Sequence, residues 1–369
     1  MKWKFPLINF SLFEFGRRAF KGGRISFKGM FLLPVYCLQI IPTLPLALLQ
    51  FLIFGRCIRK TSISKDPIFI VGHYRSGTTL LQKLMVSDKR FGYLNYYDSL
   101  FPNTNLLFGK RMQPVFQRML TIFKVKNPFF RDNLLLLSDP DEEDDYLMNK
   151  GSAYSAYWGF IFPRCWREWL NGSPQFTDPQ YFNGWKKEYL YTLKYLTYRN
   201  NGKQLVLKNP PNTERVKILL EMFPQAKFIY IYRNPYHLYY SARNMWKRAI
   251  LKYYSVQKIS DKELDEIVFE HFNYLTRQYM KDKVLIPEGN LIEISYEALK
   301  ADPFGTIQKI YSQINLPDFE STADDLLKQL ETEKSYRNFQ YQFSSETLNK
   351  IEEKWGEYIR QWKYEVDGL

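Results

Sequence analysis

Cysteine and histidine are scarce in this sequence. The 369 residues contain three cysteines and three histidines, with no CxxC pair and no cysteine beside a histidine. They are Cys37, Cys57, Cys165, His73, His237 and His271. This pattern disfavours a scaffold built on disulfides and a structural zinc site, and no metal is expected. The cysteine usage indicates a reducing compartment.

Acidic residues are nearly absent from the first sixty positions. Residues 1–60 contain ten Lys or Arg and a single acid, Glu14. The whole chain carries 52 Lys+Arg against 38 Asp+Glu, a formal charge of +14, so +9 lies in this segment and +5 in the other 309 residues. A basic surplus indicates an anionic partner, and its concentration here indicates an acidic membrane surface.

Charged residues are missing altogether from residues 31–55. A helix of about 20 apolar residues can span a bilayer, but Pro42 and Pro45 interrupt this run and disfavour a plain span. Basic residues flank it on both sides, as is typical of a segment that dips into the membrane and returns to the cytoplasmic face. These are Lys2, Lys4, Arg17, Arg18, Lys21, Arg24, Lys28, Arg56, Arg59 and Lys60.

We therefore expect residues 1–60 to be a membrane-associating segment, attached peripherally or monotopically to the inner face of the cytoplasmic membrane. The aromatic stretch 5–20 is suited to lying in the bilayer interface. A buried pair of core helices is the alternative, and the sequence leaves open whether residues 31–55 span, dip into or lie on the membrane. The oligomeric state is also open.

Residues 66–369 form the second predicted segment. Its first motif is a glycine loop that lacks the lysine usually found in such loops. Ile68 to Val71 are a buried-strand run, residues 72–77 turn the chain, and Thr78 begins a helix. Strand, glycine loop and helix direct backbone N–H groups at an anion. The spacing G-x-x-x-x-G is that of a P-loop, but Thr78 stands where ATPases and kinases have lysine, and the nearby cation is Arg75.

A second motif covers residues 203–246. Leu205 to Leu207 predict a strand that delivers Lys208 to a proline-rich loop, and residues 227–232 predict a second strand that ends at Arg233. Ser241 lies eight residues further on, in a predicted helix. With this spacing, a strand-end arginine and a helix serine can both bind the same phosphate, so we expect Arg233 and Ser241 to do so.

Together these motifs resemble the sulfotransferase family, in particular its bacterial branch with an Arg-Ser-Gly-Thr-Thr loop. A third segment, LIEISYEALKADPFGTIQKIYSQINLP at residues 291–317, resembles the family's Tyr-Glu-x-Leu stretch and the helix after it. The resemblance covers residues 66 to about 365. It implies an α/β fold with a P-loop-like central parallel sheet flanked by helices, preceded here by the apolar N-terminal helical segment.

The resemblance also implies transfer of a sulfuryl group from 3′-phosphoadenosine 5′-phosphosulfate (PAPS) to an acceptor hydroxyl. Five loop residues would hold the 5′-phosphosulfate, namely Arg75, Ser76, Gly77, Thr78 and Thr79. Arg233 and Ser241 would hold the 3′-phosphate, and Tyr296 would lie near the adenine. Arg75 and Lys208 would neutralise charge that develops during transfer.

The general base departs from the family pattern. Some relatives place a histidine just after the loop lysine, but no histidine follows Lys208 here. Others use a glutamate 21 residues beyond the loop arginine. In this chain that position is Tyr96, with Asp98 nearby. The acidic run 139–145 resembles an acidic stretch of bacterial relatives and offers Glu143 or Asp145 as the base, with a pKa raised by burial. A solvated helix start is the alternative for this run.

The acceptor is expected to be a lipophilic alcohol, such as a sterol or lipid, or a glycan. The resemblance places its pocket among residues 100–185, which are rich in aromatic side chains. They include Tyr154, Tyr157, Trp158, Phe160, Phe162, Trp166 and Trp169. Two alternatives stay open, a P-loop small-molecule kinase and a basic non-enzymatic protein that binds nucleic acid or membrane.

Overall fold

The chain folds into two compact units in a computed structural model, which describes residues 12–22, 25–27, 29–30, 43–129, 133–170, 176–333 and 343–364. Unit 1 combines Met1–Lys65, Gly92–Lys203 and Met245–Ser260. Unit 2 combines Asp66–Phe91, Gln204–Asn244 and Asp261–Leu369. Each unit is thus assembled from three separate stretches of the chain.

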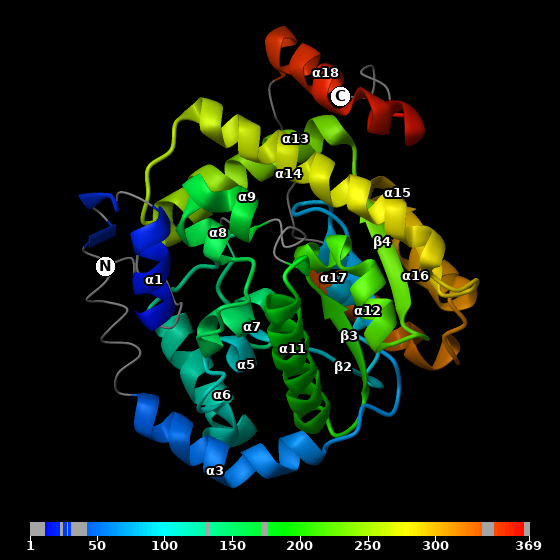
Figure 1. Cartoon of the computed structure of the whole chain (residues 1–369). Coiled ribbons are helices and arrows are strands. Elements are labelled where there is room, and N and C mark those ends of the chain that lie inside the picture. Colours follow the sequence, from blue (N-terminus) through cyan, green and yellow to red (C-terminus); the bar gives the residue numbers. More distant parts are fainter. Residues whose placement is uncertain are drawn as a thin grey trace. The chain divides into compact units, whose positions relative to one another are not determined.

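The five-stranded sheet has the strand order β2-β3-β1-β4-β5 (Figure 1). The strands are β1 (Ile68–Val71), β2 (Phe91–Gly92), β3 (Gln204–Lys208), β4 (Lys227–Tyr232) and β5 (Leu291–Ser295). β1 runs parallel to β3 and to β4, and β4 runs parallel to β5. All four residues of β1 are buried, as an apolar central strand of a parallel sheet requires. The predicted α/β fold with a central parallel sheet is confirmed.

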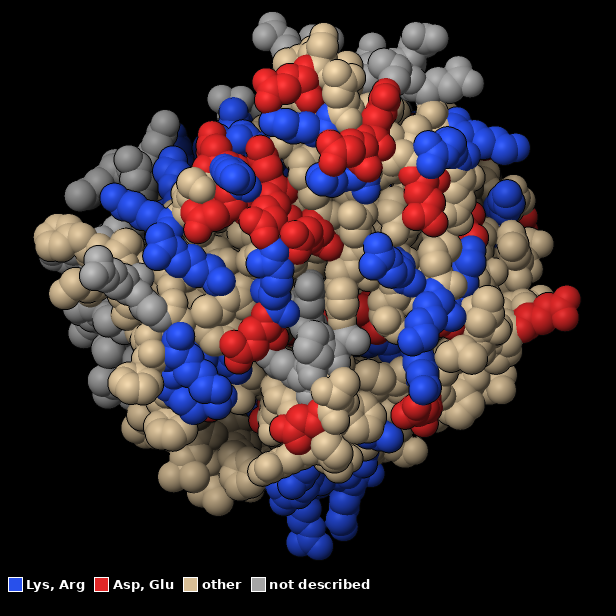
Figure 2. All heavy atoms as spheres, turned by 45° about the horizontal axis from the view of Figure 1, so that its top comes forward, with Lys and Arg blue, Asp and Glu red and all other residues tan. Residues whose placement is uncertain are grey.

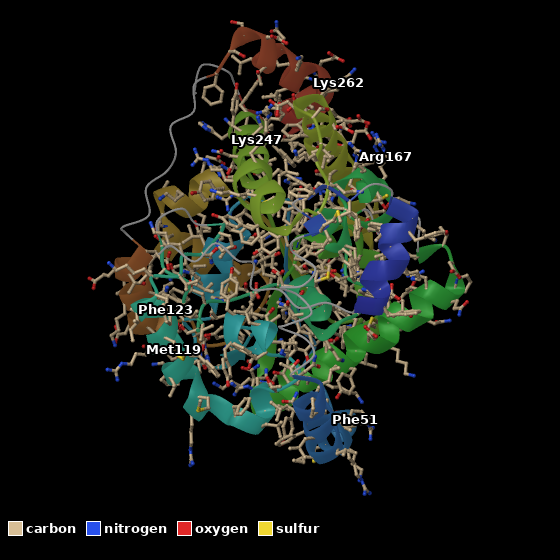
Figure 3. All side chains as sticks on the ribbon, turned by 90° about the vertical axis from the view of Figure 1, so that its left-hand side faces the viewer. Phe51, Met119, Phe123, Arg167, Lys247 and Lys262 are labelled. Carbon is tan, nitrogen blue, oxygen red and sulfur yellow. The ribbon has the colours of Figure 1, made fainter. Side chains whose placement is uncertain are left out.

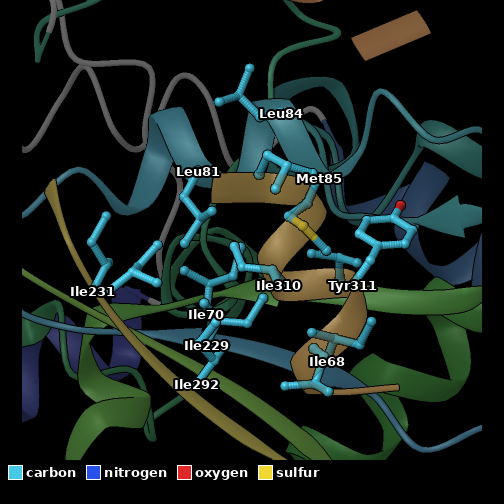
Figure 4. Close-up of a cluster of buried hydrophobic side chains, with 14 of the residues drawn as sticks. Ile68, Ile70, Leu81, Leu84, Met85, Ile229, Ile231, Ile292, Ile310 and Tyr311 are labelled. Carbon is cyan, nitrogen blue, oxygen red and sulfur yellow. The ribbon is translucent and has the colours of Figure 1, made fainter. Parts of the chain in front are cut away.

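Helices on the sheet enclose the core of unit 2. In Figure 4, Ile68 and Ile70 of β1 pack with Leu81 and Met85 of α4 and with Ile310 of α16. The helical elements are α4 (Thr78–Met85), η3 (Pro210–Glu214), α12 (Val216–Met222), α13 (Pro235–Met245), α14 (Asp261–Asp282), η5 (Lys283–Leu285), α15 (Tyr296–Ala301), α16 (Pro303–Gln313), η6 (Glu320–Thr322), α17 (Ala323–Glu333) and α18 (Ser345–Gln361).

Unit 1 is built from helices around an aromatic core. Trp158 packs with Phe162, Phe162 with Trp169, and Phe160 with Trp246. The elements are α1 (Leu12–Gly22), α3 (Leu44–Lys60), α5 (Tyr96–Leu100), α6 (Asn105–Ile122), α7 (Glu143–Lys150), α8 (Trp158–Ile161), η2 (Pro163–Cys165), α9 (Trp166–Trp169), α11 (Pro179–Arg199) and the π-helix η4 (Trp246–Tyr254). Most of the aromatic residues expected to wall the acceptor pocket are therefore core side chains.

Arg18 of α1 corrects one sequence interpretation. It counts among the basic residues predicted to flank a membrane segment, but its side chain is buried. The guanidinium lies 4.9 Å from the ring centroids of both Trp158 and Trp169 and donates to the carbonyl of Ala153. Burial lowers the pKa of Arg18 to about 10. The two indole faces replace the water around this cation, so Arg18 ties α1 to the core of unit 1.

The apolar run 31–55 is described from residue 43 onward, and residues 31–42 lie outside the described residues. Pro45 stands in the first turn of α3, a position that helices tolerate, rather than in a helix interior. Lys194 of α11 donates to the carbonyl of Arg59 at the end of α3. None of the helices in the described part of the chain combines the length and the hydrophobicity that crossing a bilayer requires.

Candidate active site

The glycine loop joins the buried end of β1 to the N-terminus of α4 within unit 2. Gly72 has φ +147°, and a Cβ there would meet the carbonyl oxygen of Ile231 at 2.3 Å. Gly77 has φ +103°, and its Cβ would meet the ring of Tyr296 at 2.3 Å. Both positions therefore require glycine. The backbone N–H and the hydroxyl of Ser76 donate to the carbonyl of His73, which closes the turn.

Four side chains that the sequence singled out come together beside this loop. Arg75 itself has φ +72°, and its Nε donates to the Ser241 hydroxyl at 3.2 Å. Arg233 leaves the end of β4 and donates from Nη1 to the carbonyl of Arg75 at 3.1 Å. Its guanidinium carbon lies 4.5 Å from the ring centroid of Tyr296. Two arginines, a hydroxyl and an aromatic ring thus surround the start of α4.

Hydrogen-bond donors at the glycine loop and beside it are available to a ligand. Arg233 Nε is buried and has no hydrogen-bond partner among the described residues. The first N–H groups of a helix, here those of α4 from Thr78 onward, lack partners within the helix. A phosphate group accepts hydrogen bonds from guanidinium, hydroxyl and backbone N–H donors alike. This donor set fits a nucleotide phosphate.

Lys208 lies buried at the end of β3, where its neighbour across the β1–β3 ladder is Ile70. The loop after it holds a residue that sequence reasoning missed. Thr213 accepts a hydrogen bond from the N–H of Gly72 at 2.8 Å, and its hydroxyl lies 3.2 Å from the Gly72 carbonyl. Thr213 therefore fixes the position of the Lys208 loop against the glycine loop. No motif signals this role, because 141 residues separate the two partners.

His73 and His271 form a buried pair next to the loop. Their ring centroids are 5.5 Å apart, and His73 also packs edge-on against Phe272. Nδ1 of His73 lies 2.8 Å from the Tyr74 carbonyl, which assigns the ring proton to Nδ1. Burial lowers the pKa of His73 to about 4 and that of His271 well below its ordinary value. Both rings are therefore neutral at physiological pH.

The proposed bases Glu143 and Asp145 begin α7 in unit 1, whereas the loop cluster belongs to unit 2. Glu143 is fully buried, whereas Asp145 is half-buried. Asp144, also buried, accepts hydrogen bonds from the backbone N–H of Ala156 and, through its carbonyl, from Ser155. The alternative interpretation of the acidic run as a solvated helix start is therefore wrong for Glu143 and Asp144. Of the two proposed bases, Glu143 is more shielded from solvent than Asp145.

Two other residues near the family's motifs have structural partners. Asp98 is buried in unit 1, where it forms an ion pair with Arg199 at 2.9 Å and accepts from Asn105. His237, on α13 between Arg233 and Ser241, packs edge-on against Phe343, and burial lowers its pKa. These contacts hold both side chains in place.

Comparison with known proteins identifies the class. The sulfotransferase family model matches residues 67–321. The omega-hydroxy-beta-dihydromenaquinone-9 sulfotransferases of Mycobacterium bovis and Mycobacterium tuberculosis are each 32% identical to this chain over 328 residues, covering 87% of it and 81% of the relative. This chain therefore belongs to the sulfotransferase family and is an enzyme that transfers sulfuryl groups.

Solved structures share the fold. The sulfotransferase STF1 from Mycobacterium tuberculosis H37Rv superposes with a TM-score of 0.68 at 16% identity, covering 92% of this chain and 89% of that one. The sulfotransferase STF9 from Mycobacterium avium gives a TM-score of 0.66 at 17% identity, covering 87% and 82%. The family assignment confirms the predicted activity over the kinase and the non-enzymatic alternatives.

Proposed function

We propose that this enzyme transfers the sulfuryl group of PAPS to the hydroxyl of a lipophilic alcohol. The observation that carries the donor half is the cluster of Arg75, Arg233, Ser241 and Tyr296 around the N-terminus of α4. A nucleotide with three phosphate-like groups needs cations, hydroxyls and backbone amides, and this cluster supplies all three.

In this proposal the two ends of the nucleotide have separate partners. The loop residues bind the 5′-phosphosulfate, and they are Arg75, Ser76, Gly77, Thr78 and Thr79. Arg233 and Ser241 bind the 3′-phosphate. The hydrogen bond from Arg75 to Ser241 supports one continuous anion site. Tyr296 packs under Arg233 and offers the ring that would lie near the adenine.

Transfer of the sulfuryl group requires that the negative charge on the donor be stabilised and that the acceptor hydroxyl lose its proton. Arg75 and Lys208 would stabilise negative charge on the sulfuryl oxygens and on the leaving phosphate. Glu143 or Asp145 would take the proton of the acceptor hydroxyl as the oxygen attacks sulfur. Of the two candidates, Glu143 is fully buried and Asp145 is half-buried, so Glu143 is the one shielded from bulk water. The proposal requires no metal ion.

The lipophilic acceptor is supported by the relatives named for a menaquinone-derived substrate, at 32% identity. A lipophilic alcohol partitions from water into the apolar interior of a bilayer. We accordingly propose that residues 1–60 hold the enzyme at the cytoplasmic face of the membrane, ahead of a sulfotransferase domain at residues 66–369. The acid-poor sequence of that segment and the exposed leucines of α3 support this attachment.

The test is transfer of isotope-labelled sulfuryl from PAPS to isoprenoid alcohols, sterols, phenols and sugars. We expect labelled product with long-chain alcohols and little with sugars. Nucleotide binding is measured beside it by calorimetry with 3′-phosphoadenosine 5′-phosphate and with ATP. If ATP bound as tightly as the 3′-phosphorylated nucleotide, the donor assignment would be wrong. Product with sugars alone would overturn the acceptor assignment.

A further inference from the structure

Exposed apolar side chains are concentrated in unit 1. Of the large apolar residues that the structure describes as exposed, all but Val284, Leu285 and Leu327 belong to unit 1. Two packed helices, α3 and α6, carry the densest group. Gln50 of α3 accepts from the N–H of Leu106 in α6 and donates to the carbonyl of Pro102, each at 2.8 Å. These bonds hold α3 against the start of α6, ahead of the kink at Gly109, where the backbone leaves helical geometry with φ +61°.

On α3, Gln50 and Ile58 face the body of unit 1, and the opposite side is apolar and exposed. Leu48 and Leu52, four residues apart, are 61% and 66% exposed. Arg56 continues this row by one more turn, so an exposed cation follows the two leucines on the same side of the helix.

On α6 a second row has the same composition. Val115, Met119 and Ile122 follow each other at helical spacing, and Ile122 is 66% exposed. Arg118 is exposed within this row. The row continues into the segment after α6, where Lys126 forms a β-bridge with the exposed Leu134. In Figure 3, Phe51 of α3 and Met119 and Phe123 at the end of α6 are labelled on the outside of the ribbon.

The charges of these helices have one sign. Residues 44–60 and 105–127 contain eight Lys or Arg and no Asp or Glu. On the face that Figure 2 displays, groups of Asp and Glu lie beside Lys and Arg. Apolar rows with basic residues and no acid match a bilayer that contains anionic lipids, because the leucines can enter the acyl region while the cations reach the phosphates.

We infer that the outer sides of α3 and α6 form one bilayer-binding surface of unit 1, which we call the α3–α6 surface. The inference rests on the proposed membrane attachment and deepens it, since half of the surface lies beyond residues 1–60. A second copy of the chain is a poor occupant, because a twofold interface would bring the basic residues of each copy against those of the other. The partner is the lipid surface.

The test is co-sedimentation of the full chain with vesicles of phosphatidylcholine, and with vesicles of equal parts phosphatidylcholine and phosphatidylglycerol. We expect binding to the anionic vesicles that weakens with salt. Leu48→Glu with Leu52→Glu, and separately Met119→Glu with Ile122→Glu, should each lower the partition coefficient at least tenfold. The matched control is Val284→Glu with Leu327→Glu, at the 77% and 50% exposed apolar residues of unit 2, which should change it less than twofold.

Charge is tested separately with Arg56→Gln and Arg118→Gln, which should weaken binding to anionic vesicles only. Absence of wild-type binding, or an equal loss in the unit 2 control, would overturn the inference. So would a wild-type dimer that the Leu48→Glu, Leu52→Glu chain fails to form in sedimentation velocity. Nucleotide binding and transfer to a water-soluble alcohol are measured on the same proteins, so that failure of the sulfotransferase proposal is seen independently of vesicle binding.

Discussion

Unit 1 and unit 2 differ sharply in charge. Unit 1 contains 29 Lys+Arg and 12 Asp+Glu, a formal charge of +17, whereas unit 2 contains 23 and 26, a formal charge of −3. The unit with the proposed nucleotide site is therefore the less basic one. An anion site depends on a few placed cations such as Arg75 and Arg233, whereas a broad basic surface serves an extended anionic partner.

The two units also differ in how they use apolar residues. Unit 2 buries its isoleucines and valines on a parallel sheet, and the carboxyl ends of β1 and β4 lead into the site. Unit 1 has an aromatic core and leaves large apolar side chains exposed on α3 and α6, whereas only three are exposed among the described residues of unit 2. We interpret this as a division of labour, with the sulfuryl donor bound by unit 2 and the membrane by unit 1.

The largest expected effect comes from the donor site. Arg75→Ala removes a cation from the proposed phosphosulfate site and should lower kcat/KM about a thousandfold. Vesicle binding should not change, since the α3–α6 surface belongs to unit 1. Arg360→Ala, at an exposed arginine of α18, is the control and should keep full activity. Equal activity of the Arg75 and Arg360 variants would refute the role of Arg75.

The proposed base is the next test. Glu143→Gln keeps the volume of a buried side chain and removes its proton affinity, so kcat should fall about a hundredfold or more. Binding of 3′-phosphoadenosine 5′-phosphate should stay constant, because the proposed partners of the nucleotide do not include Glu143. Asp145→Asn, one residue along the same turn, is the matched comparison. Loss of kcat in that variant alone would transfer the role of base to Asp145.

Arg18 tests the packing of unit 1. Arg18→Gln removes the cation between Trp158 and Trp169 and should lower the free energy of unfolding by about 2.5 kcal/mol. Arg17→Gln is the control, since Arg17 is half exposed and its ion pair with Glu14 lies at the surface. Chemical denaturation followed by tryptophan fluorescence measures both. A similar loss in the two variants would contradict the buried role of Arg18.

His73 tests unit 2 through pH. Its pKa is about 4 in the folded chain and near the ordinary 6.5 in the unfolded chain. Below pH 6.5 the unfolded chain binds a proton that the folded chain does not, so stability is complete above this pH and falls as pH decreases. The share of the loss that is due to His73 should reach about 2 kcal/mol near pH 5, and His271, whose pKa is also lowered, adds to it. His73→Gln should reduce this slope in urea unfolding, and an unchanged slope would contradict the assignment.

The sequence predicted unit 2 better than unit 1. The apolar runs that begin at Ile68 and Phe228 are local patterns, as is the glycine loop between strand and helix. Strands β1 and β4 form at these two runs. Arg75, Arg233, Ser241 and Tyr296 also meet as the family motifs imply, although their roles in binding PAPS stay proposals. Local patterns suffice here because each motif lies at a strand end or a helix start, and parallel strands bring these ends together.

Other features depend on contacts that no local pattern encodes. Arg18 reads as a surface cation in sequence, and only the approach of Trp158 and Trp169, about 140 residues later, buries it. His73 meets His271 because α14 packs against the glycine loop region. The exposed row on α6 has no long apolar run to reveal it, since its apolar residues alternate with polar ones.

One measurement tests the division of labour most directly. The transfer rate is measured with a long-chain isoprenoid alcohol embedded in anionic vesicles and with a short soluble alcohol, using wild type and the Leu48→Glu, Leu52→Glu variant. We predict that the variant loses at least tenfold in kcat/KM for the embedded alcohol and less than twofold for the soluble one. Equal losses with both alcohols, or no loss with either, would contradict the account.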